Sequence, residues 1–488
     1  MFVNNRAYSP KSKFCSQVNH TMPSRVLVFT PSTQLSATIL EQANGVANWE
    51  VTFAFGIDEA KTQLLTQSSA VLLLDCCNHR LQSELSEFLN WFADHVNYSI
   101  HLVVLTNGQY PLSLVSQIDK LNATELSLPL MFEDLGKALT NHHAGLVERP
   151  PRIAETRELT ADGITFATRT PEMFGMVERL GQIARHDVTL LLVGETGTGK
   201  TTLARIIHGL SERAGKKFLT TACGALPQEL IESELFGHLR GAFTSADQNK
   251  IGRFEAAEGG TLLLDEIDVL SPREQTRLLR VIETGEYEPV GSTVTRKSNV
   301  RLIVASNVDL TKLSESKQFR SDLYYRLNVL EFQLLPLRDR RPDIVPLSMK
   351  FVAESCKEHG KTITHVASSF LKLLRQYDWP GNLRELSNQI RRAVLLSKNG
   401  LLSVDALSDA FLDAARNQKP RSGSGVELNG QSNGHLSHQL SKSEREILVE
   451  ALRANNNNRS ATARALGISR VGFYKRMRRV GLMPPLEK

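Results

Sequence analysis

Short apolar runs alternate with amphipathic stretches through the first third of the chain. The runs with strand character are Val26–Phe29, Val51–Phe55, Ala70–Leu74, His101–Leu105 and Glu125–Leu128. Continuous apolar runs are typical of parallel strands buried on both faces, and the stretches between them predict helices. The pattern therefore predicts a doubly wound α/β domain over residues 24–147.

A second α/β unit is expected over residues 163–345. Its clearest strands are Val188–Val193, Gly260–Leu264 and Val300–Ala305. Residues 346–415 have apolar positions at helical spacing and few strand signals, so a helical lid is expected to follow. Residues 148–162 contain two adjacent prolines and mixed charge, which predicts a linker between the two α/β units.

The chain ends have a different composition. Residues 1–23 are polar and lack the apolar core of a signal peptide, so a disordered tail is expected, and the start codon stays open between Met1 and Met22. Residues 416–441 are rich in Gly, Ser, Asn and Gln and predict a flexible linker. Residues 442–488 return to helical spacing and predict a small all-α domain.

Charge is concentrated at the carboxyl-terminal end. The whole chain has a formal net charge of +6, whereas residues 442–488 contain eleven Lys and Arg against four Glu, a local net charge of 11 − 4 = +7. This asymmetry indicates DNA as a partner of the last domain. No apolar run approaches the ~18 residues of a membrane span, and the five scattered cysteines lack zinc spacing. A cytoplasmic protein without a membrane partner is expected.

The last two expected helices have the order of a helix-turn-helix. Ser460 and Ser469 can cap them, Gly467 can end the first, and Phe473 and Met477 are spaced to point inward. A solvated basic helix is the alternative, and contacts to bases or to phosphates are not assigned. The expected DNA-binding residues are Arg470, Tyr474, Lys475, Arg476, Arg478 and Arg479.

A glycine-rich loop joins the strand that ends at Val193 to an expected helix. In that context, backbone N–H groups and the helix N-terminus can bind nucleotide phosphates. Lys200 is expected to reach the β- and γ-phosphates of ATP, and Thr201 to offer a hydroxyl to Mg²⁺. The expected nucleotide-binding residues of this loop are Gly194, Glu195, Thr196, Gly197, Thr198, Gly199, Lys200, Thr201 and Thr202.

Two acids end the next strand. Asp265 can hold Mg²⁺, and Glu266 can polarise the attacking water, as phosphoryl transfer requires. Asn307 follows a further strand, where its amide can contact the γ-phosphate or the water. A turn-forming role for Asn307 stays open.

Several strings in order carry a family resemblance. They are Glu234–His238, Gly241–Ala246, Gly259–Ile267, Gln275–Arg280, Phe319–Asn328 and Trp379–Leu386. Over about 163–415 the chain resembles the AAA+ domain of bacterial enhancer-binding proteins, the sigma-54-dependent transcription activators. The resemblance implies a dimer and a hexamer-like ring, with ATP bound at the boundaries between subunits.

The resemblance also implies residue roles. Arg320 and Arg326 match arginine fingers that enter a neighbour's site, although a pair of surface arginines is the alternative. Arg384 matches an arginine on the lid that senses the nucleotide. The residues matching the loop that contacts sigma-54 are Gly241, Ala242, Phe243, Thr244, Ser245 and Ala246.

The chain departs from the family pattern at two positions. Ser245 replaces a usual glycine, which restricts the backbone of the loop. Ala222 replaces a usual asparagine that bonds the Glu266 position in one nucleotide state. We expect altered coupling between hydrolysis and loop movement, with hydrolysis retained. Phe243 is either exposed for a partner or folded back into its own domain, and both alternatives stay open.

The first domain weakly resembles a response-regulator receiver, and the last resembles a Fis-type domain. Asp75 occupies the phosphoacceptor position, and Thr106 ends the next strand. Phe29–Pro31 replaces the usual acidic pair, and Leu128–Pro129 replaces Lys-Pro, so the groups that hold metal and balance charge are missing. A degenerate receiver acting as a binding or dimerising surface is expected, with phosphorylation of Asp75 as the alternative.

These expectations combine into one function. The chain is expected to bind enhancer-like DNA and to use ATP and Mg²⁺ to remodel the closed complex of sigma-54 RNA polymerase. A first alternative is a DNA-bound regulator in which ATP controls only assembly. A second is a scaffold that acts through its amino-terminal domain.

Overall fold

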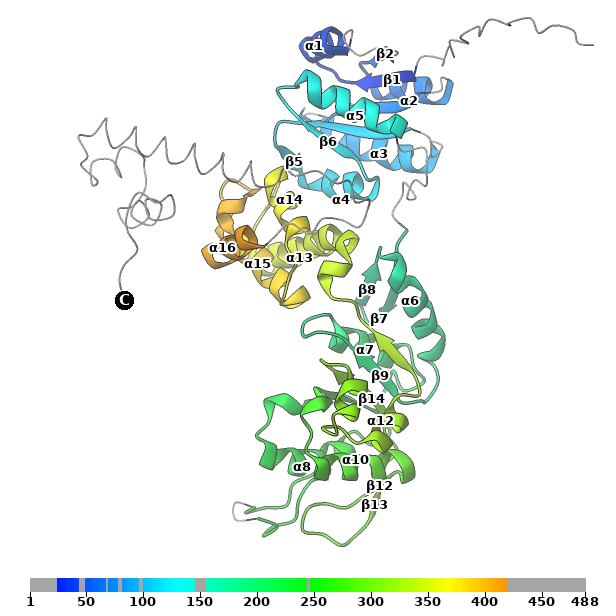
Figure 1. The fold of residues 1–488 in the computed structure, drawn as a ribbon, viewed down its shortest axis with the longest axis vertical. Coiled ribbons are helices and arrows are strands. Elements are labelled where there is room, and N and C mark those ends of the chain that lie inside the picture. Colours follow the sequence, from blue (N-terminus) through cyan, green and yellow to red (C-terminus); the bar gives the residue numbers. More distant parts are fainter. Residues whose placement is uncertain are drawn as a thin grey trace, which may run out of the picture. The chain divides into compact units, whose positions relative to one another are not determined.

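The computed structural model describes residues 24–43, 49–66, 69–77, 81–95, 100–144, 155–243 and 246–418 (Figure 1). The mixed α/β architecture confirms the predicted fold class. The expected amino-terminal tail, nearly all of the linker after residue 415 and the helix-turn-helix domain lie outside the described residues. In the described part, no helix is both long and apolar enough to span a bilayer.

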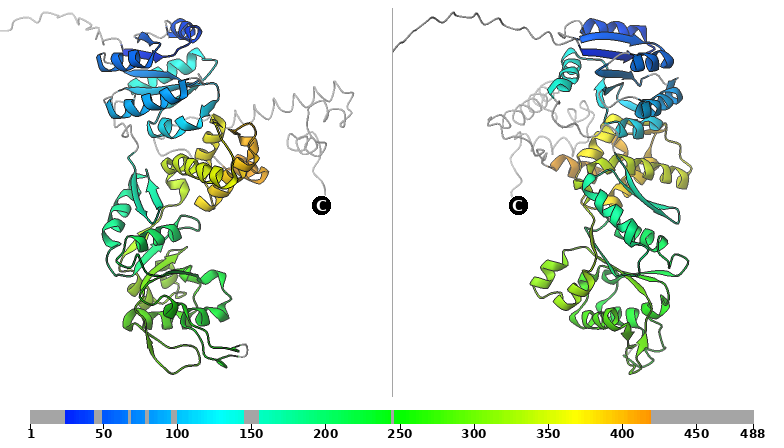
Figure 2. Two further views of the ribbon diagram at one scale, coloured as in Figure 1. Left: turned by 180° about the vertical axis from the view of Figure 1, so that it is seen from behind. Right: turned by 90° about the vertical axis from the view of Figure 1, so that its right-hand side faces the viewer.

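The amino-terminal domain is a parallel sheet with helices on both faces (Figure 1 and Figure 2). Its strand order is β2-β1-β3-β4-β6. The strands are β1 (Ser24–Phe29), β2 (Trp49–Ala54), β3 (Val71–Asp75), β4 (His101–Thr106) and β6 (Thr124–Ser127). The helices are α1 (Thr33–Ala43), α2 (Ile57–Thr66), α3 (Gln82–His95), α4 (Leu112–Lys120) and α5 (Phe132–Ala144).

Alternate side chains of the strands enter two separate cores. In β1, Leu27 and Phe29 pack with α2, α3 and α4, whereas Val26 and Val28 pack with α1 and α5. All five residues of β3 are buried. Because both faces of these strands are covered, their sequences are apolar at successive positions, which is why the strands were predictable.

The second α/β unit has a parallel sheet in the order β10-β11-β14-β9-β15. Its strands are β9 (Leu190–Val193), β10 (Phe218–Ala222), β11 (Thr261–Asp265), β14 (Arg301–Ser306) and β15 (Glu331–Gln333). Its longer helices are α6 (Pro171–Ile183), α7 (Lys200–Gly209), α8 (Gln228–Phe236) and α10 (Pro272–Thr284). Shorter ones are α9 (Arg253–Ala256), α11 (Leu310–Glu315) and α12 (Ser321–Leu327). A small antiparallel pair, β12 (Glu286–Tyr287) and β13 (Arg296–Lys297), follows α10.

The segment expected to be a linker contains a strand at its end. β7 (Arg157–Ala161) pairs antiparallel with β8 (Ile164–Thr168). Leu159 and Ala161 pack against the core that α6 and α7 share with the sheet. β7 alternates half-buried and exposed residues. Its exposed positions, Glu158 and Thr160, are polar, and Arg157 is charged, so the apolar inward positions are few in the sequence.

The lid contains four helices and two short strands. These are α13 (Ile344–His359), β16 (His365–Ala367), α14 (Ser368–Gln376), α15 (Asn382–Leu396), β17 (Leu401–Leu402) and α16 (Asp409–Asn417). Trp379 is fully buried, and its indole Nε1 donates to the Leu374 carbonyl at 2.9 Å. The tryptophan thus joins the end of α14 to the turn that precedes α15.

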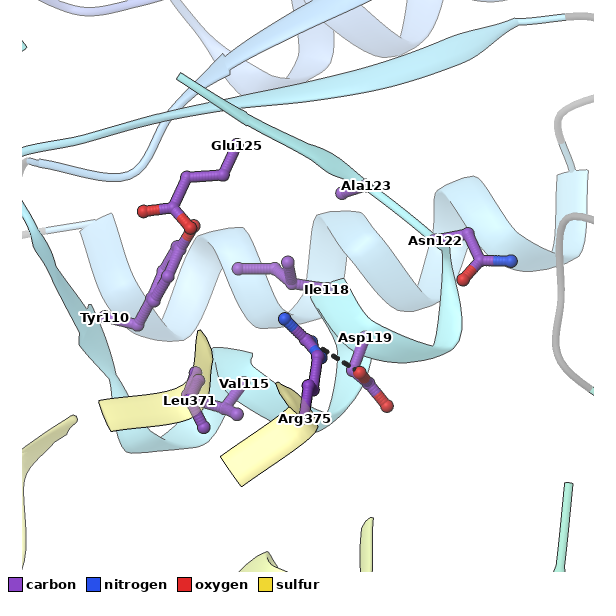
Figure 3. A pocket seen from close by; sticks show the side chains of 9 residues that line it. All are labelled: Tyr110, Val115, Ile118, Asp119, Asn122, Ala123, Glu125, Leu371 and Arg375. Atoms are coloured by element: carbon purple, nitrogen blue, oxygen red, sulfur yellow. Dashed lines mark hydrogen bonds and ion pairs between the residues drawn. The ribbon is translucent and has the colours of Figure 1, made fainter. Parts of the chain in front are cut away.

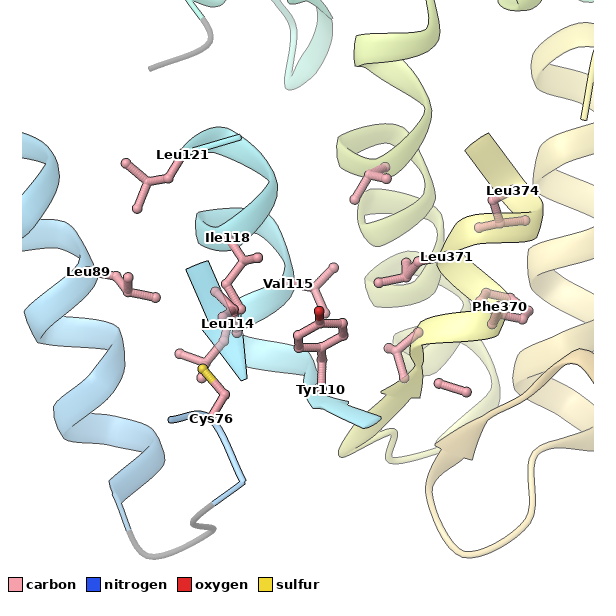
Figure 4. Close-up of a cluster of buried hydrophobic side chains, with 14 of the residues drawn as sticks. Cys76, Leu89, Tyr110, Leu114, Val115, Ile118, Leu121, Phe370, Leu371 and Leu374 are labelled. Atoms are coloured by element: carbon pink, nitrogen blue, oxygen red, sulfur yellow. The ribbon is translucent and has the colours of Figure 1, made fainter. Parts of the chain in front are cut away.

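A strand of the amino-terminal domain extends the lid's small sheet. β5 (Gln109–Pro111) pairs antiparallel with β16, which gives the three-stranded order β17-β16-β5. Tyr110 and Val115 of the first domain lie beside Leu371 of the lid in one buried apolar cluster (Figure 4). The two domains therefore share backbone hydrogen bonds and part of a core.

An acid beside this strand pair binds arginines from two other elements. Asp119 of α4 accepts from Arg169 at 2.8 Å and from Arg375 of α14 at 2.6 Å. Asp119 lines a cavity of about 350 Å³. Tyr110 and Glu125 line the same cavity, with the tyrosine hydroxyl next to the carboxylate (Figure 3). Burial, followed by the negative charge of Glu125, raises the pKa of Tyr110. The side chain of Arg169 is only 11% exposed, so Asp119 compensates a positive charge that solvent reaches poorly.

We expect Asp119→Asn to weaken the contact between the amino-terminal domain and the lid. The change removes a charge partner from a largely buried arginine, at a cost of about 1–3 kcal/mol. If local opening becomes easier by that amount, the amides of β5 and β16 should exchange with solvent about 5- to 150-fold faster. Hydrogen-exchange mass spectrometry on the full chain measures this rate.

Asp94→Asn is the matched control, because Asp94 is exposed on α3 of the same domain. It should leave exchange in both strands unchanged. Equal rates in wild type, Asp119→Asn and Asp94→Asn would contradict the importance of the Asp119 ion pairs.

Candidate nucleotide-binding site

The glycine-rich loop lies between β9 and α7. Gly197 and Gly199 have φ values of +81° and +106°, which side chains rarely adopt. A Cβ on Gly197 would also lie 2.5 Å from the carbonyl oxygen of Gly381 in the lid. The loop therefore needs glycine both for its backbone turn and for its close approach to the lid.

Lys200 stands at the start of α7 with its ammonium turned back into the loop. Its Nζ donates to the carbonyl of Gly194 at 2.6 Å, to that of Glu195 at 3.1 Å and to Asn307 Oδ1 at 2.8 Å. The residue is only 5% exposed. Burial lowers the pKa of Lys200, and the nearby carboxylates of Asp265, Asp268 and Glu266 oppose that effect.

The two residues expected to hold a divalent cation lie in contact. Thr201 Oγ1 donates to Asp265 Oδ2 at 3.1 Å, from the start of α7 to the end of β11. A hydroxyl and a carboxylate are the oxygen ligands that Mg²⁺ prefers. The donor set therefore fits Mg²⁺, with room for phosphate oxygens and water in the adjoining cavity.

Glu266 is held by the amide of Asn307. Asn307 Nδ2 donates to Glu266 Oε1 at 3.2 Å, while the same side chain accepts from Lys200. Glu266 has a φ of +58°, an uncommon backbone conformation for a residue with a side chain. Its other carboxylate oxygen lies so close to Gly224 that a Cβ there would overlap it. Asn307 thus lies between Lys200 and Glu266, and its expected contact with the γ-phosphate or the water stays a prediction.

Asp268 is a site residue that sequence reasoning missed. Its Oδ1 accepts from Ser306 Oγ at 3.1 Å and from the Asn307 backbone N–H at 3.3 Å. It thereby positions the end of β14. The string Gly259–Ile267 stops one residue before Asp268. The nearness of Asp268 to Glu266 in the sequence was therefore the available signal.

The lid closes one side of the cavity. Arg384, Leu383 and Ser387 of α15 line a volume of about 320 Å³ together with the glycine-rich loop and Thr202. The backbone N–H of Leu383 donates to the Gly197 carbonyl at 2.9 Å. The structure thus places Arg384 beside the expected phosphate site.

Three further lid-side residues bind the glycine-rich loop and were missed from the sequence. Arg338 makes two hydrogen bonds to Glu195, at 2.5 and 2.8 Å, which lower the pKa of that carboxyl. Asn382 Nδ2 donates to the Thr196 carbonyl at 3.0 Å. The buried Arg340 donates to the Thr198 carbonyl at 2.9 Å. The arginine-rich run at 338–341 was a local signal for the two arginines, and Asn382 lies in the string Trp379–Leu386.

The two expected finger arginines are not among the residues that line this cavity. Arg320, at the start of α12, pairs with Asp322 at 2.6 Å, and Arg326 pairs with Glu283 at 2.8 Å. Their side chains are 42% and 61% exposed. Within the chain they are exposed arginines with acidic partners.

The segment expected to contact sigma-54 is the loop from Gly241 to Ala246, which follows His238 closely in the chain. The Gly241 backbone N–H donates to the Ala246 carbonyl at 2.8 Å, which closes the base of the loop. Phe243 is half-buried, with its ring 4.8 Å from the ring of His238 in an edge-on arrangement. Thr244 and Ser245 lie outside the described residues, as do the expected DNA-binding residues. The described conformation has Phe243 folded toward its own domain.

Asp75 is buried at the end of β3, with an exposure of 3%. Its carboxylate accepts from Thr30 Oγ1 at 2.8 Å and from the Cys77 backbone N–H at 2.9 Å. Among the described residues there is no group of three or more His, Cys, Asp or Glu arranged to hold a metal ion. Asp75 therefore accepts a hydrogen bond from Thr30, which belongs to the segment that replaces the acidic pair of a receiver.

Three family models match the chain in sequence. The sigma-54 interaction domain matches residues 166–333, the AAA+ ATPase lid domain matches residues 338–424, and the Fis family of bacterial regulatory proteins matches residues 439–479. The first two ranges contain the glycine-rich loop, the acid pair and Arg384. The third contains the basic helix expected from the sequence.

Curated relatives share the same region. The alginate biosynthesis transcriptional regulatory protein AlgB of Pseudomonas aeruginosa is 39% identical over 325 residues, which are 67% of this chain and 69% of AlgB. The C4-dicarboxylate transport transcriptional regulatory protein DctD of Rhizobium meliloti is 38% identical over 69% of each chain. A crystal structure of NtrX from Brucella abortus with ATP aligns over 94% of this chain and 100% of that one, with 24% identity and a TM-score of 0.46.

The matched models and relatives agree with the geometry of the site. The glycine-rich loop, the acids after β11 and the lid arginine occupy the matched ATPase and lid regions. A Fis-type region follows them in the sequence. The chain belongs to the sigma-54-dependent transcriptional activators.

Proposed function

We propose that this activator binds enhancer-like DNA through its last domain and hydrolyses ATP, with Mg²⁺, in a ring of subunits. Turnover drives the 241–246 loop against sigma-54 in the closed polymerase complex, and the promoter opens. The observation that carries the proposal is the chain of contacts from Lys200 through Asn307 to Glu266, beside the pair Thr201 and Asp265.

Each of these side chains has a separate task. Bound Mg-ATP supplies the phosphoryl group and the cation. Lys200 is buried yet charge-compensated, so it can orient the β- and γ-phosphates, while Thr201 and Asp265 hold the cation. Glu266 orients water and accepts its proton. Asn307 keeps Glu266 in place.

The ring completes the site from a neighbouring subunit. Arg320 and Arg326 are exposed and only paired with surface acids, so an incoming phosphate can compete for them. An arginine supplied to the transferring phosphoryl group is worth ~10³–10⁵ in rate in known cases. We therefore assign these arginines to the site of an adjacent protomer.

Movement of the loop needs a small rearrangement. Phe243 is only half-buried against His238, so its release exposes an aromatic anchor at limited cost. The loop base at Gly241 and Ala246 can stay closed while the ring moves. Ser245 and Ala222 set how tightly this movement follows hydrolysis.

Regulation by assembly alone is the competing function. Assembly control requires only that ATP binds, so the site would not need an oriented general base. The strained backbone of Glu266 and its bond to Asn307 support hydrolysis, because backbone strain is maintained where the side chain must be precisely placed.

We expect Glu266→Gln to retain ATP binding and to lose turnover by about 10² or more, because the amide cannot accept the proton. In vitro transcription with sigma-54 RNA polymerase should fall with it. Phosphate release and transcript yield are measured with and without ATP. Glu315→Gln, an exposed substitution on α11, is the control and should match wild type. Unchanged transcription in Glu266→Gln would favour assembly control.

A second prediction concerns the partner of Glu266. Asn307→Ala removes the amide, so kcat should fall about tenfold or more with a smaller change in KM. Ala222 is paired with Asp265 in the sheet register, so Ala222→Asn places a new amide near Glu266. In the Asn307→Ala background, Ala222→Asn should restore part of kcat.

The double-mutant cycle supplies the control. Ala222→Asn alone should alter turnover less than it does in the Asn307→Ala background, because Glu266 already has an amide partner in wild type. Strictly additive effects on kcat would show that the two positions do not serve the same carboxylate.

A further inference from the structure

A second cavity lies at the carboxyl edge of the amino-terminal sheet. Its volume is about 620 Å³, within the usual range of small-molecule sites. β1 and β3 are neighbours in the sheet, and the chain leaves them toward opposite faces, to α1 and to α3. Ligands of open α/β sheets bind in the crevice at such a reversal of strand order.

The cavity wall is mainly apolar with a few polar groups. Leu35 of α1 faces the turn formed by Leu128, Pro129 and Leu130 after β6. Apolar surface with a small number of polar groups is the usual composition of a site for an organic molecule. The wall contributes apolar contact from two elements that are far apart in sequence.

The polar groups on the wall are mostly acceptors or hydroxyls. Gln42 Nε2 donates to the Leu130 carbonyl at 2.6 Å, which orients the amide. The other amide atom, Oε1, is buried without a hydrogen-bond partner in the described structure. Because Oε1 is buried, the carboxylate of Asp75 on the same wall is the acceptor considered for a ligand with an N–H or O–H group. Ser32 and Thr38 offer hydroxyls on the same side.

Charge selects against anions. Asp75 lines the cavity, and no Lys, Arg or His is among the described residues that do so. The carboxylate accepts hydrogen bonds from Thr30 Oγ1 and from the Cys77 backbone N–H. A phosphate or carboxylate ligand would meet this charge without a compensating cation, whereas a neutral or cationic ligand would not.

We propose that this cavity binds a small neutral or cationic organic molecule, which has an apolar ring-sized body and at least one N–H donor. The amino-terminal domain is thus a ligand-binding domain, and Asp75 is a recognition group for a donor. The proposal is independent of ATP turnover and of DNA binding.

Three probes of the same shape test the charge selection. Benzamidine, benzamide and benzoate share a ring and differ in charge at neutral pH. Saturation-transfer NMR on the full chain, with ADP present at the nucleotide site, should detect benzamidine and benzamide with Kd values on the order of millimolar, as expected for probes this small. Benzoate should give no signal that depends on the cavity.

A filled cavity identifies where the probes bind. Thr38→Phe places a ring in the cavity and should reduce the benzamidine and benzamide signals at least about fivefold. Ala37→Phe is the matched control, because Ala37 is exposed on the same helix and does not line the cavity. Probe signals that persist in Thr38→Phe, or a cavity-dependent benzoate signal equal to that of benzamide, would overturn the proposal.

Asp75→Asn tests the role of the negative charge directly. It also replaces Thr38→Phe as the test variant if circular dichroism shows that Thr38→Phe is unfolded. It should weaken benzamidine about tenfold relative to benzamide, whereas an equal effect on both probes would overturn the role of Asp75. Incubation with acetyl phosphate and Mg²⁺ should leave the intact mass unchanged. A phosphoryl adduct on Asp75 would instead establish a phosphorylated receiver.

Discussion

The buried ammonium of Lys200 is the constraint on which the nucleotide site depends. A cation this inaccessible is tolerated only when oxygen atoms surround it, and here two loop carbonyls and the Asn307 amide do so. Asn307 can reach Lys200 only because β14 lies between β9 and β11. The same strand order brings Glu266 within reach of that amide. Compensation of one charge thus fixes the relative positions of the loop, the general base and its partner.

The lid contacts both the glycine-rich loop and the amino-terminal domain. On one side, Asn382 and Arg338 bind the glycine-rich loop through Thr196 and Glu195. On the other, β16 pairs with β5 of the amino-terminal domain. A change in the angle of the lid therefore changes two sets of hydrogen bonds at once. Coupling between the domains requires no direct contact of the first domain with nucleotide.

Sequence reasoning could point to residues whose pattern is local. Lys200 and Thr201 follow the glycines directly, and Asp265 and Glu266 end a buried strand. The structure brings these side chains together, and their catalytic and cation-binding roles stay predictions. Contacts between distant segments were beyond it: Asn382 reaches Glu195 across 187 residues, and no periodicity encodes that approach. β7 was predicted to be part of a linker, because exposed polar residues alternate with its half-buried ones and two adjacent prolines precede it. Arg320 and Arg326 stay predictions, since a finger acts on another subunit.

The amino-terminal domain has the receiver architecture with a different electrostatic balance. A phosphoacceptor needs cations to offset a doubly charged product, and here Thr30 faces Asp75 while Leu128 stands in the usual lysine position. Yet the backbone N–H of Leu128 donates to the Thr106 carbonyl, and Thr106 Oγ1 donates to the carbonyl of Gln109 in β5. These hydrogen bonds link this edge of the sheet to the strand that meets the lid. A ligand that displaces Leu128 would break its hydrogen bond to Thr106. It would thereby affect the hydrogen bonds that a phosphoryl group on Asp75 would have to change in order to reach β5.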